Sequence, residues 1–531
     1  IPFYQGDTGS IYTHDVSGTD DTAANNTAFG LTAMDAITTG DSNVAVGHGA
    51  GSAMTTSEKN VIVGKDAALV KGASSNRGVH IGFESAKGLT TGSDILSIGY
   101  QSYLAADTED HNLAIGRAAL GGAVAGGEYN VAIGNYSLDA LTTGDLNTTL
   151  GYAAGSDLTT GVRNVIIGSE AADALTTGGS NVFIGDNCGG TGVITGSQNV
   201  VMGRNAGEDI TSGQYNTLIG FESGLQLTDS EQNTALGWKS LKGNTTGDNN
   251  IAIGSQALIN PDTEANNLAI GVGALGGAIA GGEANVAIGN FSLDALTSGD
   301  NNVAVGYNSG TVLTTGVNNV TIGDAAGANI TTGSGNTCVG KDTGNIGAPI
   351  TTGSNNIFVG NAIAGTDSTH VNAIGIGHNF TVVGDHFAFG KQSNVVSNAF
   401  TSNANWARTS DERLKTNITN VSWNSLDFIN ALRPVTFTWR NSADVPTDMY
   451  EYDADKNHMD TTTVIDGLIA QEVKTAIDAH SMTNFGGWST DHKGTQTLSK
   501  EAFVVPLIKA VQELSATITT LQQEINTLKG E

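Results

Sequence analysis

The sequence predicts a mainly β protein, in which a parallel β-solenoid with coils of about 17 residues precedes a small α+β domain that ends in a long helix. Three observations predict this fold: a glycine-terminated repeat, a change of composition near residue 409, and a heptad pattern at the C-terminus. Of the 72 glycines among the 531 residues, only five follow residue 409. The chain therefore consists of two differently built parts.

The first part repeats a unit of the form Asn-h-x-h-Gly, where h is apolar, as in residues 130–134. Asparagine stands four residues before the glycine in 17 of 19 units, and Gly78 and Ile95 are the exceptions. A unit this short cannot bury its own apolar face, so successive units must stack into a solenoid with one short strand per coil. The strand-ending glycines follow one another at steps of 17 or 18 residues: Gly30, Gly47, Gly64, Gly82, Gly99, Gly116, Gly134, Gly151, Gly168, Gly185, Gly203, Gly220, Gly237, Gly254, Gly271, Gly289, Gly306, Gly323 and Gly340.

Three features of the unit predict how the coils are built. Alternation along the strand places two apolar, mostly β-branched side chains on one face. The asparagines are expected to stack as a ladder, in which each side-chain amide bonds its neighbours in adjacent coils. A Thr-Thr-Gly or Thr-Ser-Gly block, such as residues 142–144, has its glycine seven residues before the strand-ending glycine of its coil. The composition of this block is typical of a turn, and its glycine is expected to adopt a positive φ.

A longer period lies above the short one, because residues 266–296 nearly repeat residues 111–141 at an offset of nine coils. Beyond Gly340 the pattern loosens, as expected where a terminus must cover an open edge. The predicted organisation is a connecting segment 1–25, regular solenoid repeats 26–340 in two tandem nine-coil blocks, a degenerate solenoid or cap 341–390, a linker 391–409, and a C-terminal domain 410–531 with a coiled coil at 504–528.

The C-terminal part carries two motifs. Residues 410–415 read Ser-Asp-Glu-Arg-Leu-Lys, which taken alone suits the start of a helix with Ser410 as N-cap. Near the end of the chain, apolar residues alternate in steps of three and four without interruption, which predicts a coiled coil. Val or Ile at position a with Leu at position d is by itself the pattern of dimers. The seam consists of Val504, Leu507, Val511, Leu514, Ile518, Leu521, Ile525 and Leu528.

The composition excludes several classes of function. A net charge of −29 repels phosphate backbones and anionic lipid, and no apolar run approaches the ~18 residues of a membrane helix, so neither nucleic acid nor membrane is expected as a partner. Cys188 and Cys338 lie nine coils apart, too far for a disulfide, and are expected to be free thiols. Asp453, Asp455 and Asn457 imitate the start of a calcium loop but lack its glycine and glutamate, so we expect no metal and no cofactor.

The repeat resembles the head repeats of trimeric autotransporter adhesins and the Asn-Thr-Ala-Ile-Gly repeats of phage tail-fibre-like proteins, in which three chains wind parallel β-rolls around one axis. Residues 410–415, followed by residues 432–439 and 467–473, resemble the intramolecular chaperone auto-processing domain found behind phage tail spikes, endosialidases and tail fibres. The resemblance implies a homotrimer, including a three-stranded terminal coiled coil. It also implies a domain that guides folding of the upstream β-structure and then cuts itself off.

In that family the cut is made by a Ser/Lys dyad, and the matching positions here are Ser410 and Lys415. The implied cleavage site lies between Thr409 and Ser410, which makes the domain a single-turnover endopeptidase, and no activity is expected of the rod. A serine hydroxyl is a weak nucleophile that needs a base, and a buried lysine can serve because burial lowers a lysine pKa. Arg413 and Asn417 are candidates for holding the oxyanion or the loop.

Together these features predict a tail fibre or spike of a virion, whose trimeric rod attaches to a host-surface glycan or protein. Its N-terminus is expected to join the phage tail or another anchoring protein. Two alternatives remain open, an extracellular adhesin on a bacterial surface and a glycan-cleaving spike. The latter requires carboxylates clustered across coils, whereas regular repeats dominate. Ice binding would require the Thr-Thr rows to lie on a flat exposed face rather than in a turn.

Overall fold

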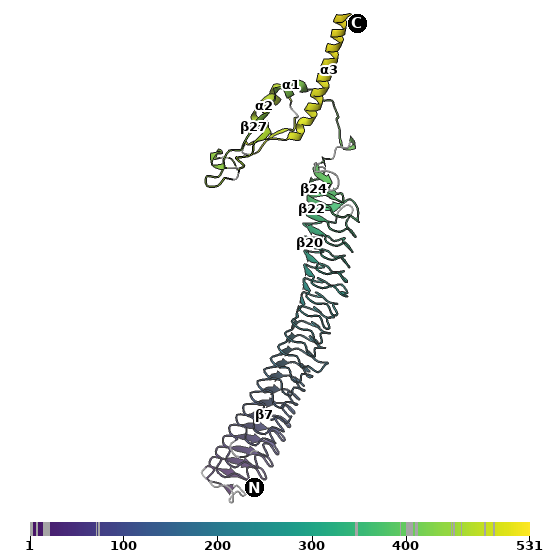
Figure 1. The fold of residues 1–531 in the computed structure, drawn as a ribbon. Helices are drawn as coiled ribbons and strands as arrows, with labels where there is room; N and C mark the ends of the chain where they lie inside the picture. The colour runs from purple at the N-terminus through teal and green to yellow at the C-terminus, as the bar shows by residue number, and fades with distance from the viewer. Residues whose placement is uncertain are drawn as a thin grey trace. The chain divides into compact units, whose positions relative to one another are not determined.

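The chain folds into two compact units, Ile1–Thr409 and Ser410–Glu531. Figure 1 shows both units in a computed structural model. The first is an elongated stack of coils, and the second is a small mixed domain with a long terminal helix. The structure describes residues 4–6, 9–13, 22–70, 72, 75–345, 349–392, 394–399, 407–408, 412–447, 449, 452–457, 459–482, 485–491 and 494–530.

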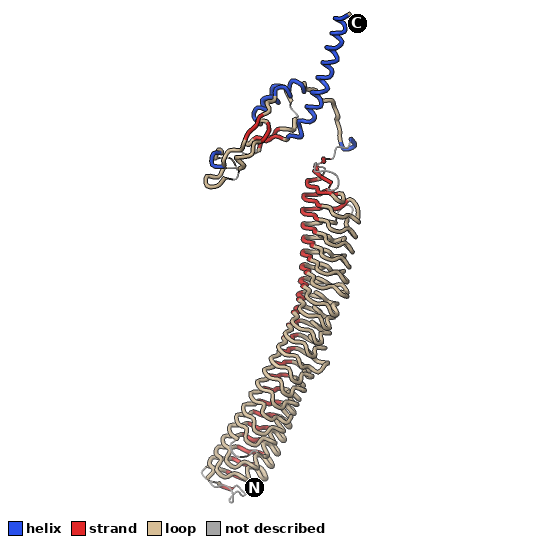
Figure 2. Tube along the Cα trace, in the orientation of Figure 1, coloured by secondary structure: helices blue, strands red, loops and turns tan. Residues whose placement is uncertain are grey.

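The first unit contains one three-residue strand per coil throughout the regular repeat, which confirms the predicted parallel β-solenoid (Figure 2). Each strand pairs in parallel with the strand of the next coil, so that Val131 of one coil lies opposite Thr148 of the next. These strands are β3 (Thr27–Phe29), β4 (Val44–Val46), β5 (Val61–Val63), β6 (Val79–Ile81), β7 (Leu96–Ile98), β8 (Leu113–Ile115), β9 (Val131–Ile133), β10 (Thr148–Leu150), β11 (Val165–Ile167), β12 (Val182–Ile184), β13 (Val200–Met202), β14 (Thr217–Ile219), β15 (Thr234–Leu236), β16 (Ile251–Ile253), β17 (Leu268–Ile270), β18 (Val286–Ile288), β19 (Val303–Val305), β20 (Val320–Ile322) and β21 (Thr337–Val339).

The pattern changes at both ends of the stack. At the start, β1 and β2 pair antiparallel, and β2 then joins β3 in parallel. After β21 the strands lengthen: β22 and β23 continue the parallel stack and β24 extends it, whereas β25 and β26 return antiparallel. Antiparallel returns cover the open edge of the last coil. The bounds are β1 (Tyr4–Gln5), β2 (Ile11–Tyr12), β22 (Ile357–Gly365), β23 (Ile374–Val382), β24 (His386–Lys391), β25 (Asn394–Ala399) and β26 (Ala407–Arg408).

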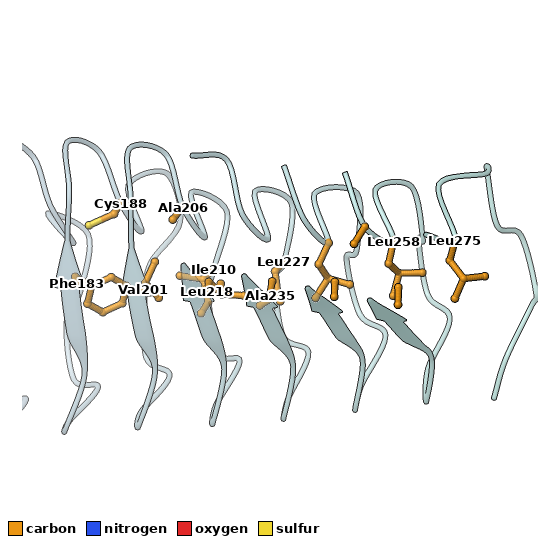
Figure 3. Packing of buried hydrophobic residues seen from close by; sticks show 14 of the residues in the cluster. Phe183, Cys188, Val201, Ala206, Ile210, Leu218, Leu227, Ala235, Leu258 and Leu275 are labelled. Atoms are coloured by element: carbon orange, nitrogen blue, oxygen red, sulfur yellow. The ribbon is translucent and has the colours of Figure 1, made fainter. Parts of the chain in front are cut away.

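The alternation along each strand places the middle residue inside the coil and the two flanking apolar residues on the outer face. In β9, Ala132 is fully buried, whereas Val131 and Ile133 remain partly exposed. Figure 3 shows the interior, where the middle residues Phe183 and Val201 pack beside each other in successive coils. The interior of each coil is therefore filled within the chain, while the apolar strand pairs face outward along the stack.

The predicted asparagine ladder is present and buried. The Asn147 side-chain nitrogen donates to the Oδ1 atom of Asn130 in the preceding coil (3.1 Å) and to the carbonyl of Gly161 (2.9 Å). The same Asn130 Oδ1 atom accepts the backbone N–H of Asn147. Each asparagine thus satisfies polar groups of the coils on both sides, which links the interior of the stack by hydrogen bonds that water cannot replace.

Replacing Asn147 by Ala should destabilise the rod. The change leaves the buried Gly161 carbonyl and the buried Asn164 N–H, which donates to Asn147 Oδ1 (3.0 Å), without these partners. Each unsatisfied buried group costs about 1–3 kcal/mol, so a loss on the order of 3 kcal/mol is expected in the free energy of unfolding. Thr143→Ala, on the exposed second threonine of the turn, is the matched control and should change the unfolding midpoint little. Equal midpoints for the two variants would contradict the role of the ladder.

The two coils that lack the ladder asparagine carry a different buried polar layer. Gly78 still donates its backbone N–H to the preceding Asn60 Oδ1 atom (2.9 Å). Inside these coils, the middle residues His80 and Ser97 are buried, with His80 Nδ1 and Ser97 Oγ 2.9 Å apart. The buried imidazole and hydroxyl thus satisfy each other inside the coils where the ladder is interrupted.

The expected positive φ at the Thr-Thr-Gly turn is wrong, and the positive φ occurs at the strand-ending glycine instead. Gly134 has a φ of +140°, whereas Gly144 of the turn does not adopt a positive φ. The turn glycine is required for a different reason, since a Cβ atom there would collide with the Gly161 carbonyl of the next coil. The first threonine of the turn, Thr142, donates its hydroxyl to the carbonyl of Thr159 (3.0 Å). These hydroxyls are part of the turn, which argues against an ice-binding face.

Both cysteines are buried free thiols, as the sequence predicts. Burial raises the pKa of Cys188 and of Cys338 to about 12, because the interior of the coils disfavours the thiolate. Figure 3 shows Cys188 among the core side chains. A thiol that stays protonated at neutral pH is inert, so these residues pack rather than react.

The second unit is a small α+β domain around a separate core. Phe428 of α1 lies at its centre, with its ring centroid 5.5 Å from that of Phe485 and 6.3 Å from that of Phe503. Its elements are η1 (Glu412–Leu414), α1 (Ser425–Ala431), β27 (Val435–Phe437), η2 (Ser442–Asp444), β28 (Ile465–Gly467), α2 (Ala470–Ala479), β29 (Trp488–Thr490), β30 (Gln496–Leu498), η3 (Lys500–Phe503) and α3 (Val504–Lys529). The pairs β27–β28 and β29–β30 are antiparallel.

The terminal helix α3 is attached to this domain by its first half. Pro506 and Ala510 are buried, and Glu513 accepts the backbone N–H of Leu426 at the start of α1 (2.8 Å). By length and composition alone, the segment Lys500–Lys529 could cross a membrane, which is weak evidence because a core helix passes the same test. From Val511 onward its large apolar residues all lie on the heptad seam with other residues between them, a distribution typical of a coiled coil.

Candidate functional site

The candidate cleavage site lies at the boundary between the two compact units, which falls between Thr409 and Ser410. Both of these residues are outside the part of the chain that the structure describes. Lys415 follows the single 3-10 turn η1, and its backbone N–H donates to the Glu412 carbonyl (2.9 Å). The segment after Ser410 thus begins with one short turn rather than with the α-helix that an N-cap at Ser410 would predict. Asn417, three residues after η1, has a φ of +55°.

The described residues of this motif lie on the surface of the single chain. Arg413, Lys415 and Asn417 are exposed, and so are the apolar side chains of Leu414 (71 %) and Ile418 (63 %). A lysine acts as a general base in a site that excludes water, because burial disfavours its charged form. The described part of one chain leaves Lys415 exposed.

Two further sequence motifs of the domain meet in space. Arg433, from the Leu-Arg-Pro segment before β27, forms a two-pronged ion pair with Glu472 in the first turn of α2. The guanidinium lowers the pKa of the Glu472 carboxyl, mainly through these hydrogen bonds. The sequence places both residues in motifs but gives no sign of their pairing, since 39 residues separate them. The pair connects α2 to the chain that leaves α1.

The comparisons with known proteins bear on the same segment. Residues 410–482 match the family Peptidase_S74, the chaperone of endosialidase. The C-terminal unit therefore carries a chaperone-of-endosialidase domain. No curated protein matches the chain. This chaperone domain behind a β-solenoid fits a tail spike or tail fibre, as the resemblance predicts.

The chaperone domain leaves one long apolar surface uncovered. All eight residues of the α3 seam are exposed, from 43 % for Ile525 to 87 % for Leu528. Soluble monomers rarely expose contiguous apolar patches of this extent, and such patches mark interfaces. The heptad spacing of the seam predicts that its partners are other helices.

The rod has a second apolar surface on its outer strand face. The flanking residues of the short strands stack in register from coil to coil, so that they form a continuous stripe; Val44, Leu150, Leu236 and Ile251 are examples of exposed members. Most coils contribute two apolar side chains to this stripe, and threonine takes the first of the two positions in β3, β10, β14, β15 and β21. The stripe remains exposed in the single chain, as expected for a surface that contacts another molecule.

Buried carboxylates of the rod serve its structure. Glu264 takes the place of the turn glycine, and its Oε2 atom accepts the N–H groups of Asp262 (2.7 Å) and Thr263 (3.1 Å) while its Oε1 atom accepts that of Gly281 (2.6 Å). Glu109 occupies the equivalent position of the first block with the same kind of contacts. Carboxylates committed to backbone N–H groups in this way do not form the opposed pair of a glycosidase.

Proposed function

We propose that the protein is a homotrimeric rod of a phage tail fibre or tail spike that attaches the virion to a host surface. The observation that carries this proposal is the exposed heptad seam of α3. The apolar stripe on the rod and the heptad seam on the helix are both exposed in one chain. In a homotrimer with one threefold axis, the neighbouring chains cover both surfaces. The dimer preference of the helix pattern is then overridden by contacts between the rods. The N-terminal end joins the tail or another anchoring protein.

In the same proposal, the chaperone domain aligns three chains and then releases the rod. The Ser410 hydroxyl loses its proton to Lys415 and attacks the Thr409 carbonyl carbon through a five-membered ring. The peptide C–N bond breaks, the amino group of Ser410 leaves with a proton, and an ester joins Thr409 to the Ser410 oxygen. Water then hydrolyses the ester, which gives a carboxylate at Thr409 and restores the serine. Arg413 and Asn417 hold the oxyanion or the loop.

Because Lys415 is exposed in one chain, this reaction depends on assembly of the chains. A base that functions only when shielded from water becomes competent when neighbouring chains cover it, so cleavage follows trimer formation. The exposed Leu414 and Ile418 on the same segment offer apolar contacts for that cover. A rod would then be released only after its three chains are aligned.

The trimer is tested with a charge placed in the seam. Ile518→Asp puts three carboxylates into the predicted helix interface, where an uncompensated buried charge costs several kcal/mol. Light scattering of the uncut Ser410→Ala protein should give three times the chain mass of 54.1 kDa, and adding Ile518→Asp to it should give a smaller mass. Gln523→Asp, on the helix surface opposite the seam, is the matched control and should remain trimeric. A wild type that is a clean monomer or dimer would overturn the proposal.

Attachment is tested separately from assembly. Fluorescently labelled trimeric rod, purified without the chaperone domain after folding, is mixed with a panel of bacterial isolates and measured by flow cytometry. Attachment predicts saturable binding to some isolates and competition by unlabelled rod. Absence of saturable binding across the panel, with the trimer intact, would overturn the attachment role while leaving the assembly role standing.

A further inference from the structure

One edge of the rod carries an unusual line of aromatic and cationic side chains, which we call the aromatic–cation row. Its members come from six successive coils and lie one or two residues after the strand-ending glycine. Tyr100 and Phe83 stack at 5.3 Å with an interplanar angle of 9°. The row consists of Lys65, Phe83, Tyr100, Arg117, Tyr136 and Tyr152. With a coil spacing of about 4.8 Å, it extends over roughly 24 Å.

Arg117 is the centre of the row. Its guanidinium carbon lies 5.7 Å from the ring centroid of Tyr100 and 5.4 Å from that of Tyr136, so that one ring on each side holds it. Tyr136 in turn meets Tyr152 edge to face at 6.0 Å. Lys65 closes the other end, with its Nζ atom 5.3 Å from the Phe83 centroid. Neighbouring rings and cations thus contact one another without a gap.

Arg117 differs from the neighbouring lysines in its ion pairing. Lys65 is paired with Asp66 (2.8 Å), and Lys87 with Glu84 (2.7 Å). Among the described residues no carboxylate forms an ion pair with Arg117, although the chain carries a net charge of −29. Its guanidinium lies over both tyrosine rings, and a guanidinium that no carboxylate pairs can bind one through two hydrogen bonds.

The second nine-coil block provides an internal comparison. There Ser255 and Val272 occupy the positions of Tyr100 and Arg117, so the line of contacts is broken. The ladder asparagine is kept at Asn112 and Asn267, whereas other buried positions differ, as Tyr103 and Leu258 illustrate. The second block nevertheless forms the same coils, so the coil folds without the row.

We propose that the aromatic–cation row binds a linear glycan in which acidic sugars alternate with neutral ones. The proposal rests on the attachment function above and names its ligand. Pyranose C–H faces pack on the exposed rings of Tyr100 (47 %) and Tyr152 (51 %), and one sugar carboxylate bonds Arg117. The coil spacing is comparable to the length of one sugar unit, so successive sugars can meet successive coils. The net charge disfavours a uniformly charged polyanion, which selects a glycan with neutral sugars between the acidic ones.

The test uses the two blocks as each other's control. Binding of a hyaluronan octasaccharide, of neutral chitohexaose and of polygalacturonate to the trimeric protein is measured by calorimetry. Hyaluronan should bind best, and its affinity should fall at least tenfold with Arg117→Val and with Tyr100→Ser, each of which installs the residue of the second block. The double variant Ser255→Tyr with Val272→Arg should add a second site per chain.

Three results would overturn the inference: no hyaluronan binding by the wild type, equal affinity of wild type and Arg117→Val, or an Arg117→Val variant that changes only the melting temperature of the trimer. The last result would assign the row to contacts between chains. The cell-binding assay keeps this outcome separate from the attachment role. If Arg117→Val still binds cells as the wild type does, attachment stands and the row is not its site. If the wild type binds hyaluronan but no cells, the row stands and attachment falls.

Discussion

Replacing Ser410 by Ala will leave an uncut chain of 531 residues, whereas the wild type will yield the fragments 1–409 and 410–531. The serine oxygen is the only atom in the proposed reaction that can form the ester, so its loss should slow cleavage on the order of 10³-fold or more. Denaturing mass spectrometry of the expressed protein reports both outcomes directly. Equal processing of wild type and variant would show that another group makes the cut.

The lysine is tested with a substitution that retains its charge. Lys415→Arg preserves a cation at the same place but cannot act as a base, because a guanidinium is not deprotonated in proteins. We expect Lys415→Arg to be as uncut as Lys415→Ala. Lys456→Ala, on an exposed lysine elsewhere in the domain, is the control and should be cut like the wild type. Cleavage of Lys415→Arg at the wild-type rate would limit the residue to an electrostatic role.

A gene that ends at Thr409 should give aggregated or misregistered protein, whereas loss of residues 410–531 after folding should leave a soluble rod that resists SDS and protease. The reason is the regularity of the stack. Each coil presents nearly the same apolar strand pair, so three chains shifted by one coil would keep most of their contacts. Only features at the ends distinguish the aligned trimer from shifted ones.

In the proposed assembly, the chaperone domain acts before the rods associate. A coiled coil at the C-terminus would bring three chains together in one register, which would convert a search among separate chains into a tethered one. Assembly of long-range β-structure is slow and exposes apolar surface, so an early alignment also limits aggregation. Cleavage would then remove the template, and the proposal expects a rod that stays folded because it unfolds slowly rather than because it can refold. Soluble, protease-resistant trimers from the shortened gene would contradict this role.

Much of the rod could be predicted from the sequence because the period of the repeat equals the length of one coil. A fixed spacing between asparagine and strand-ending glycine defines one coil, and stacking then determines the ladder seen at Asn130 and Asn147. The sequence predicts a positive φ for the turn glycine, and this prediction is wrong. Glycine can be required for its φ or for its missing Cβ atom, and a sequence does not distinguish the two. Gly134 needs a positive φ, whereas Gly144 needs only the space that a missing Cβ leaves.

Other features could not be predicted because they depend on contacts between coils or on the direction of a face. Alternation shows that Val131 and Ile133 share a face but not that this face points outward. The two rings around Arg117 come from neighbouring coils, and only the register between the coils brings them together. In the C-terminal unit, the motif locates Ser410 and Lys415, whereas the exposure of Lys415 in a single chain requires the structure.

The mass of the native wild-type protein tests the central claim most directly, since alignment by the chaperone domain and attachment by the rod both presuppose three chains. Native mass spectrometry of protein expressed from the full-length gene should show a particle of three chains, either intact at three times 54.1 kDa or shortened to three copies of residues 1–409. A particle that contains one or two chains, cut or uncut, would contradict it.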